Sequence, residues 1–224
     1  MNALPIKICG ITREQDLLCA VAAGASAVGF VLYPPSPRYV TPERAAELAA
    51  LLPAFVTPVL LFVNASAAEI EHAAGLVPGA WLQFHGDETP DFCQEMAQNL
   101  GRRWIRVARI PKETPEGAAP FDLLKYASDY SQAHALLLDT LVDAYGGSGS
   151  TFNWSQLPIN VNAHLVLSGG LTPANVADGI RAVYSRGRSL AVDVSSGVES
   201  AKGIKDADKI RAFVAAVRNT PLAS

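Results

Sequence analysis

The chain has 224 residues, of which 50% are hydrophobic and 17% charged, and its formal net charge is −3. A disordered chain is excluded, because disorder needs low hydrophobicity and high net charge, and a pI near 5.8 lacks the basic footprint of a nucleic-acid-binding protein. The length suits one α/β barrel, a fold that takes ~200–250 residues. We therefore expect a single domain over residues 1–224.

The three cysteines, Cys9, Cys19 and Cys93, are too few and too irregularly spaced for a disulfide framework. A reducing compartment is the simplest interpretation. The sequence opens without a basic region followed by an apolar stretch, and its apolar runs have the length of strands rather than of membrane helices. We therefore expect a soluble, cytoplasmic protein.

Eight short apolar runs alternate with helix-like segments along most of the chain. Because these runs are continuous, they are typical of parallel strands buried on both faces. Thr-Pro pairs at Thr41, Thr89 and Thr172 predict helix starts, since threonine caps a helix and proline suits its first turn. The predicted strands are Ile6–Cys9, Ala27–Leu32, Val59–Val63, Ala80–Phe84, Trp104–Ala108, Ala135–Leu138, Ala163–Leu167 and Leu190–Val194.

Other signals complete the predicted order of elements. Gly24, Gly75 and Gly101 predict helix ends, a last helix begins near Asp206, and the Gly- and Ser-rich stretch 140–162 has room only for a short helix over 154–157. Eight such units fit either a closed barrel or an open doubly wound sheet. The turn after the first strand lacks the G-x-G-x-x-G pattern of a dinucleotide site. We therefore predict the α/β class and a (βα)8 TIM barrel.

In such a barrel the chemistry lies at the carboxyl ends of the strands. Small-residue loops follow the seventh and eighth predicted strands, where barrels usually bind phosphate, and such loops can turn backbone N–H groups toward an anion. Two tight turns would need the same glycines. Their joint occurrence at these two positions favours a phosphate site formed by Gly169, Gly170, Ser196 and Gly197.

Cys9 ends the first predicted strand and Asp139 follows the sixth. The Cys9 thiol is a candidate base, although a thiol with a pKa of about 8.5 is mostly protonated at neutral pH, and Lys7 on the same strand face helps only modestly. An acid at the end of a buried strand favours its protonated form unless it is paired, which suits a general acid. The alternatives are a cysteine that only fills the core and a carboxylate that caps a helix or pairs with Arg38 or Arg109.

Two further side chains are candidates for binding. Arg38 follows the second strand on a proline-stiffened loop, which suits a substrate carboxylate, although a surface salt bridge is the simpler alternative. His85 follows the fourth strand, where a lone histidine is more often a structural group than a catalyst. Metal-ligand spacing is absent from the sequence, so we expect no metal.

Together these motifs resemble the phosphoribosylanthranilate isomerase family. The resemblance runs from about residue 6 to residue 214, in the right order and at strand ends. Phe84 and Asn153 depart from the leucine and aspartate that are common in the family, and neither touches the proposed acid or base. The motifs are Lys7–Thr12, Ser36–Tyr39, Gln83–Gly86, Leu137–Thr140, Gly146–Gly149 with Thr151–Trp154, Leu167–Leu171 and Val192–Glu199.

The resemblance implies a monofunctional isomerase of tryptophan biosynthesis. Its substrate is a phosphosugar, N-(5'-phosphoribosyl)anthranilate, which an Amadori rearrangement converts to 1-(2-carboxyphenylamino)-1-deoxyribulose 5-phosphate without a cofactor. By motif position, Asp139 is the general acid that opens the sugar ring and Cys9 is the base that removes the C2′ proton. Substrate-binding roles fall to Lys7, Arg38, Gln83 and His85.

The resemblance leaves partners and rivals open. We expect no nucleic-acid or membrane partner, a monomer or a homodimer, and closure of the Gly146–Gly149 stretch over the substrate. The rivals are the aminoaldose isomerase of histidine biosynthesis, expected to carry an aspartate in place of Cys9, and indole-glycerol-phosphate synthase, expected to use lysine. A non-catalytic phosphosugar-binding barrel is the third, although intact Cys9 and Asp139 disfavour it.

Overall fold

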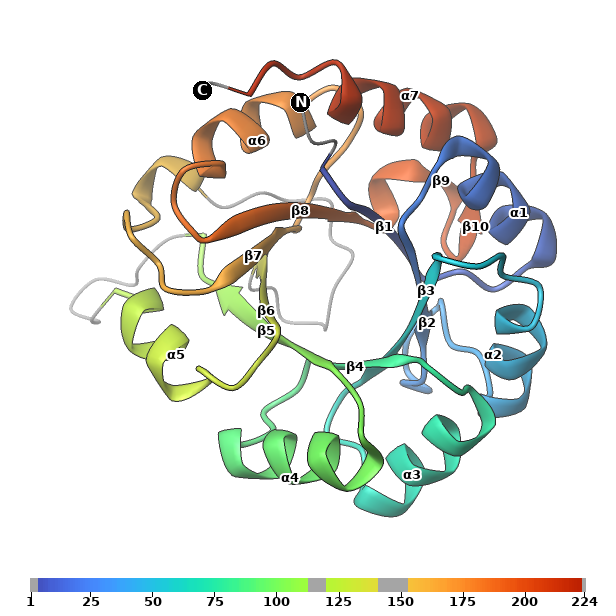
Figure 1. Ribbon diagram of the computed structural model, residues 1–224. Helices are drawn as coiled ribbons and strands as arrows, with labels where there is room; N and C mark the ends of the chain where they lie inside the picture. Colours follow the sequence, from blue (N-terminus) through green and yellow to red (C-terminus); the bar gives the residue numbers. More distant parts are fainter. Residues whose placement is uncertain (1–3, 113–119, 141–152, 223–224) are drawn as a thin grey trace.

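Eight parallel strands close into a barrel in a computed structural model that describes residues 4–112, 120–140 and 153–222. Each strand pairs with the next along the chain, and the last pairs with the first, which confirms the closed barrel over the open sheet (Figure 1). The Gly146–Gly149 stretch lies outside the described residues. The barrel strands are β1 (Ile6–Cys9), β2 (Ala27–Val31), β3 (Thr57–Phe62), β4 (Trp81–Phe84), β5 (Trp104–Ile110), β6 (Ala135–Thr140), β7 (His164–Leu167) and β8 (Ser189–Val194).

The helices surround the barrel (Figure 1). A two-stranded antiparallel sheet, formed by β9 (Glu199–Ala201) and β10 (Ile204–Lys205), follows β8 and was not predicted from the sequence. Among the described residues no helix is long and apolar enough to cross a membrane. The helices are α1 (Glu14–Ala23), α2 (Pro42–Ala49), α3 (Ala67–Leu76), α4 (Pro90–Leu100), α5 (Leu123–Asp129), α6 (Val176–Val183) and α7 (Ala207–Arg218), with 3-10 turns η1 (Trp154–Gln156) and η2 (Ser196–Val198).

Two of the three predicted Thr-Pro helix starts are confirmed. The hydroxyls of Thr41 and Thr89 accept backbone N–H groups in the first turns of α2 and α4, and such caps stabilise a helix by about 1 kcal/mol. The prediction at Thr172 is wrong, because α6 begins four residues later. There the Asn175 side chain accepts from Thr172 N at 2.7 Å and donates to Gly170 O at 3.0 Å. Asn175 thus closes the loop after β7 before the helix begins.

The predicted helix ends are confirmed at two glycines and wrong at the third. Gly24 and Gly101 end α1 and α4 in the left-handed conformation, with φ of 98° and 61°. Gly75 lies inside α3, which continues to Leu76. Asp206 caps α7, as the predicted start near this residue requires.

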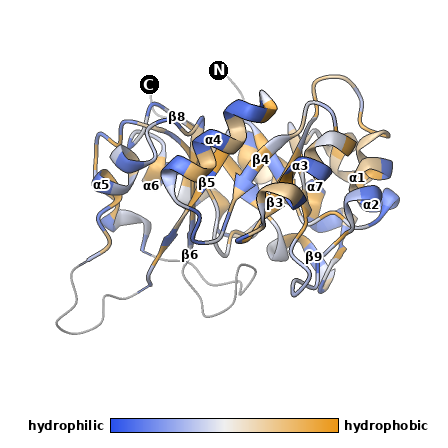
Figure 2. Cartoon of the chain, turned by 90° about the horizontal axis from the view of Figure 1, so that it is seen from below, coloured by the Kyte–Doolittle hydropathy of each residue, from blue (hydrophilic) through white to orange (hydrophobic). Residues whose placement is uncertain are grey.

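The two-residue repeat of each strand decides which side chains meet inside the barrel. In β1, Ile6 and Ile8 join the apolar shell between barrel and helices, whereas Cys9 belongs to a small interior cluster near the carboxyl ends of the strands. A second interior cluster, which includes Val59 and Ala135, lies near the amino ends. Figure 2 shows the chain ends on one side of the barrel and β9 on the other, so the termini lie away from the carboxyl ends of the strands.

Candidate active site

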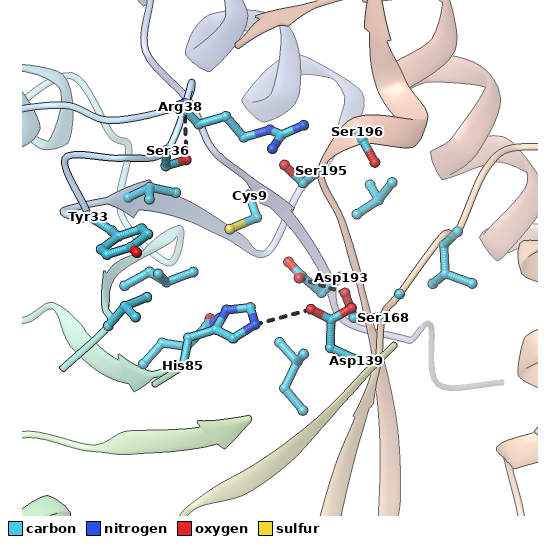
Figure 3. Close-up of a pocket in the computed structure, with 18 of the residues that line it drawn as sticks. Cys9, Tyr33, Ser36, Arg38, His85, Asp139, Ser168, Asp193, Ser195 and Ser196 are labelled. Carbon is cyan, nitrogen blue, oxygen red and sulfur yellow. Dashed lines mark hydrogen bonds and ion pairs between the residues drawn. The ribbon is translucent and has the colours of Figure 1, made fainter. Parts of the chain in front are cut away.

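A pocket opens at the carboxyl ends of the barrel strands (Figure 3). Its polar lining comes from strands far apart in the sequence, because parallel strands that close into a barrel bring all their carboxyl ends to one rim. In Figure 3 the Cys9 thiol lies between Arg38 on one side and the His85–Asp139 pair on the other. The polar and glycine residues of the lining are Cys9, Tyr33, Ser36, Arg38, Gln83, His85, Asp139, Ser168, Gly169, Gly170, Asp193, Ser195 and Ser196.

The Cys9 thiol and the Lys7 side chain share the space above Gly29. A Cβ on Gly29 would lie 2.7 Å from Cys9 Sγ and 3.1 Å from Lys7 Cε. Cys9 of β1 lies opposite Gly29 of β2 in the sheet. Because glycine has no side chain, this position leaves space for the thiol and for Lys7. Both side chains point into the barrel from the same face of β1, as the sequence predicted for positions two residues apart.

Substituting Gly29 is expected to displace the thiol. Gly29→Ala should lower kcat about 10²-fold, the cost of a misplacement near 1 Å at a reacting group. Gly75→Ala is the matched control, because nothing lies within 4 Å of a Cβ there and alanine favours the α3 helix. Steady-state kinetics and thermal unfolding of both variants give the test. Unchanged kcat in a folded Gly29→Ala would contradict this placement of the thiol.

Lys7 forms a buried ion pair with Asp193 beneath the pocket. Lys7 Nζ lies 2.8 Å from Asp193 Oδ1, and Ser168 Oγ donates to the other carboxylate oxygen at 3.1 Å. Burial raises the pKa of the Cys9 thiol, while the Lys7 ammonium opposes that rise through its charge and a hydrogen bond. The ion pair therefore keeps a positive charge beside a thiol that is otherwise hard to ionise.

The Asp139 carboxylate reaches the pocket from the end of β6. Its Oδ2 lies 3.1 Å from His85 Nε2, and both side chains are nearly buried. Its Oδ1 accepts from the backbone N–H of Thr140 at 2.8 Å. This approach to His85, which lacks hydrogen-bond geometry, places Asp139 beside a second ionisable group in the pocket, so Asp139 is more than the helix cap considered from the sequence.

The loop after β7 carries the Gly169–Gly170 pair. Both glycines have positive φ, 76° and 67°, and a Cβ on Gly169 would lie 2.6 Å from Thr140 N. Among the described residues, neither glycine's backbone N–H donates a hydrogen bond in the structure. Adjacent N–H groups in a left-handed turn, open toward a pocket, form a concavity suited to an anion.

The loop after β8 completes this part of the pocket. Ser195 and Ser196 line it, whereas Gly197 lies beside it, where a Cβ would meet Leu171 O at 1.8 Å. Gly197 therefore lets the two loops pack closely together. This contact keeps the Gly169–Gly170 turn and the serines on one side of the pocket.

Arg38 is buried and held by Glu199. Its Nε and Nη2 donate to the two carboxylate oxygens at 2.7 and 2.8 Å, a bidentate pair that uses one edge of the guanidinium. Lys205 donates to the same carboxylate at 2.9 Å and to Ser195 O at 3.0 Å. Burial alone would raise the pKa of Glu199, but Arg38 and Lys205 outweigh burial and lower it. The salt bridge considered from the sequence thus exists, but it is buried and leaves the other edge of Arg38 facing the pocket.

The structure brings most of the predicted site residues into this one pocket and places two beside it, Lys7 in its ion pair and Gly197 in the loop contact. Sequence reasoning gave no role to Asp193, Glu199 or Lys205. A signal was present for Asp193, a charged residue inside an apolar strand. The pocket residues among the predictions are Cys9, Arg38, Gln83, His85, Asp139, Gly169, Gly170 and Ser196.

Along most of its length the chain is similar to proteins of one known family. A sequence model of the N-(5'phosphoribosyl)anthranilate (PRA) isomerase family matches residues 6–216. The chain belongs to this family. The PRA isomerase of Methylibium petroleiphilum is 55% identical over 95% of this chain and 93% of its own length. The crystal structure of the Thermotoga maritima PRA isomerase is 40% identical, with a TM-score of 0.80 over 96% of this chain and 98% of that one.

Two further PRA isomerase structures extend the comparison. One, 36% identical with a TM-score of 0.75, is a complex with reduced 1-(o-carboxyphenylamino)-1-deoxyribulose 5-phosphate and covers 96% of this chain and 98% of that one. The other, 34% identical with a TM-score of 0.73 and the same coverage, is of monomers generated from the dimeric T. maritima enzyme. Membership makes this chain an isomerase of tryptophan biosynthesis, as the sequence motifs predicted, and decides against the rival barrels.

Proposed function

We propose that Cys9 and Asp139 perform the PRA isomerase reaction by acid–base catalysis in the pocket at the carboxyl ends of the strands. The observation that supports this most directly is that a thiol and a carboxyl group, from two non-adjacent strands, line one pocket beside an open anion-binding turn. The thiol, the carboxyl group and the turn come from the ends of different strands. The roles proposed below follow from what each side chain touches.

The first step opens the sugar ring. The Asp139 carboxyl group gives its proton to the furanose oxygen, the bond between that oxygen and C1′ breaks, and the anthranilate nitrogen lone pair forms a C1′=N iminium. The short contact between the two side chains supports this role, because His85 can return a proton to Asp139 after each turnover. General acid catalysis of this kind contributes about 10²- to 10⁴-fold.

The second step removes the C2′ proton. The iminium acidifies C2′, and the Cys9 thiolate takes its proton while the C–H electrons form a C1′=C2′ bond and the C=N pair returns to nitrogen. The resulting enolamine becomes the ketone when the C2′ hydroxyl loses its proton and C1′ gains one. In this mechanism Lys7 supports the thiolate from beside the pocket, and the substrate-binding role expected for it from the sequence stays a prediction.

Binding groups hold the two ends of the substrate. The Gly169–Gly170 turn and Ser196 take the phosphate, and the open edge of Arg38 takes the anthranilate carboxylate. Gln83 is almost completely buried, and its Oε1 accepts no hydrogen bond from the described residues, so it suits a ribose hydroxyl. Binding energy at the phosphate fixes the orientation of carbons that react elsewhere.

The phosphate site predicts an effect of charge. Ser196→Asp places a carboxylate in the turn, where it repels the substrate phosphate. KM should therefore rise more than about tenfold, the effect expected of one charged contact, with a smaller change in kcat. Ser200→Asp is the control, because it adds the same charge on exposed β9. Turnover can be monitored as the decay of anthranilate fluorescence. In this assay inorganic phosphate should inhibit the parent competitively and should inhibit Ser196→Asp more weakly. Equal effects of both substitutions would contradict this site.

A second cavity lies at the amino ends of the strands. We call it the basal cavity; Ala27, Ala135 and Ala191 leave it open inside the barrel, and Trp81 and Arg103 line it. Packed barrels normally fill this space with side chains. Phe55 is fully exposed, with φ of 71°, two residues before Thr57, which also lines the cavity. An exposed phenylalanine beside an unfilled apolar cavity is self-complementary under two-fold symmetry.

We propose a homodimer in which Phe55 of each copy enters the basal cavity of the other. Phe55→Ser should then give monomers by light scattering, and Ala191→Leu should do the same by filling the cavity. Leu18→Ser, which removes an apolar side chain 54% exposed on α1, should not. A monomeric parent, or dimers in both test variants, would contradict this assembly.

We also propose that residues 1–224 form one domain and that the enzyme works in the cytoplasm. One closed barrel and the helices that surround it account for most of the described residues, which supports the first proposal. A single cooperative unfolding transition, with activity and circular dichroism lost together, is expected.

A further inference from the structure

A buried ion pair between the barrel and its helices takes no part in the proposed mechanism. Glu88 Oε2 and Arg106 Nη1 lie 2.6 Å apart, with side chains 3% and 5% exposed. Desolvating two charges costs several kcal/mol, and a buried pair is weak support for stability. The function of this pair is therefore to be sought in the groups that it hydrogen-bonds and not in its contribution to stability.

The pair grips the backbone on both sides of His85. Arg106 donates to Phe84 O at 3.2 Å and to Gly86 O at 3.0 Å, and Glu88 accepts from Gly86 N at 2.9 Å. The peptide groups before and after His85 are thus held by two charged side chains. Hydrogen bonds to charged groups are stronger than those between neutral ones.

Neighbouring elements hold the pair itself. Tyr126 OH accepts from Arg106 Nε at 2.7 Å, and the Tyr130 ring lies 4.7 Å beneath the guanidinium. The second Glu88 oxygen accepts from Asn64 N at 2.8 Å, which ties the turn after β3 to the turn after β4. The Glu88–Arg106 pair is therefore held in place by contacts on the side that faces away from the pocket.

The contacts that begin at the Glu88–Arg106 pair lead through His85 to the carboxyl group of Asp139. His85 N donates to Phe62 O at 2.9 Å, and the imidazole extends into the pocket to Asp139. We propose that the Glu88–Arg106 pair is a positioning device that fixes the His85 imidazole against Asp139. The inference rests on the acid role assigned to Asp139 under Proposed function.

The test is a mutant cycle. Glu88→Gln/Arg106→Met removes both charges with little change in volume, and a buried pair replaced in this way is often tolerated. In the parent background it should lower kcat about 10- to 10²-fold with KM nearly unchanged. In a His85→Asn background it should have no further effect on kcat. Met96→Ala, which opens space in nearby α4, is the control for lost stability and should keep kcat.

The His85 ring gives a readout that does not depend on catalysis. The imidazole ¹⁵N signals should shift or broaden in Glu88→Gln/Arg106→Met and stay unchanged in Met96→Ala. Unchanged ring signals, or equal losses of kcat with and without His85, would overturn the inference. If the signals move while His85→Asn itself keeps full kcat, the return of a proton from His85 to Asp139 under Proposed function fails, whereas the positioning of the ring by the Glu88–Arg106 pair is supported.

Discussion

Cys9→Ala is expected to lower kcat by about 10²- to 10⁴-fold, the range for loss of a general base. Affinity should stay within about tenfold, because the substrate phosphate and carboxylate bind elsewhere. Cys19→Ala is the matched control, since the Cys19 thiol lies on the helix side of the barrel, where it donates to Ala207 O at 3.9 Å. A Cys9→Ala enzyme with kcat near that of the parent would remove the thiol from the mechanism.

The pH dependence of kcat/KM gives a second view of the same thiol. Burial raises the pKa of Cys9, and Lys7 opposes that rise. Losing Lys7 therefore raises the pKa further, so the rising limb of the profile should move to higher pH in Lys7→Met. Lys7→Met/Asp193→Asn, which leaves no unpaired buried carboxylate, should move it in the same direction by less, because the Asp193 charge itself raises the pKa of the thiol. A limb that moves to lower pH would contradict the role of Lys7.

Asp139→Asn is expected to lower kcat by about 10²- to 10⁴-fold, because the amide cannot give a proton to the ring oxygen. Asparagine keeps the size of the side chain and an oxygen that can accept from Thr140 N. The fold and substrate affinity should therefore survive, which thermal unfolding and titration with the product can verify.

Asp129→Asn makes the same chemical change at an exposed position on α5, where the carboxylate pairs with Lys125. Its kcat should equal that of the parent. Comparable activity in Asp139→Asn and Asp129→Asn would mean that another group opens the ring.

The barrel could be predicted from the sequence because the patterns that mark its strands and helices lie within short segments of the chain. Continuous apolar runs marked all eight strands, and alternation along a strand placed Lys7 and Cys9 on one face before any neighbour was known. Caps at Thr41 and Thr89 were readable for the same reason. The start at Thr172 was not, because Asn175 folds back on the loop and competes with the helix signal.

The pairings inside the site could not be predicted, because they join residues that only barrel closure brings together. Lys7 and Asp193 meet because β8 pairs with β1, and Arg38 meets Glu199 across two loops. Neither contact can be predicted from the spacing of these residues along the chain. Gly197, whose phosphate contact stays a prediction, also allows the two loops to pack closely, and only the position of Leu171 O reveals this packing.

In the proposed mechanism Asp139 acts at ring opening and Cys9 at C2′, and one measurement separates the two steps. Substrate deuterated at C2′ should turn over more slowly than unlabelled substrate in Cys9→Ser, where proton abstraction by a weak base limits the rate. In Asp139→Asn the isotope effect should be close to unity, because ring opening then limits the rate. A large isotope effect in Asp139→Asn together with none in Cys9→Ser would contradict these roles of Asp139 and Cys9.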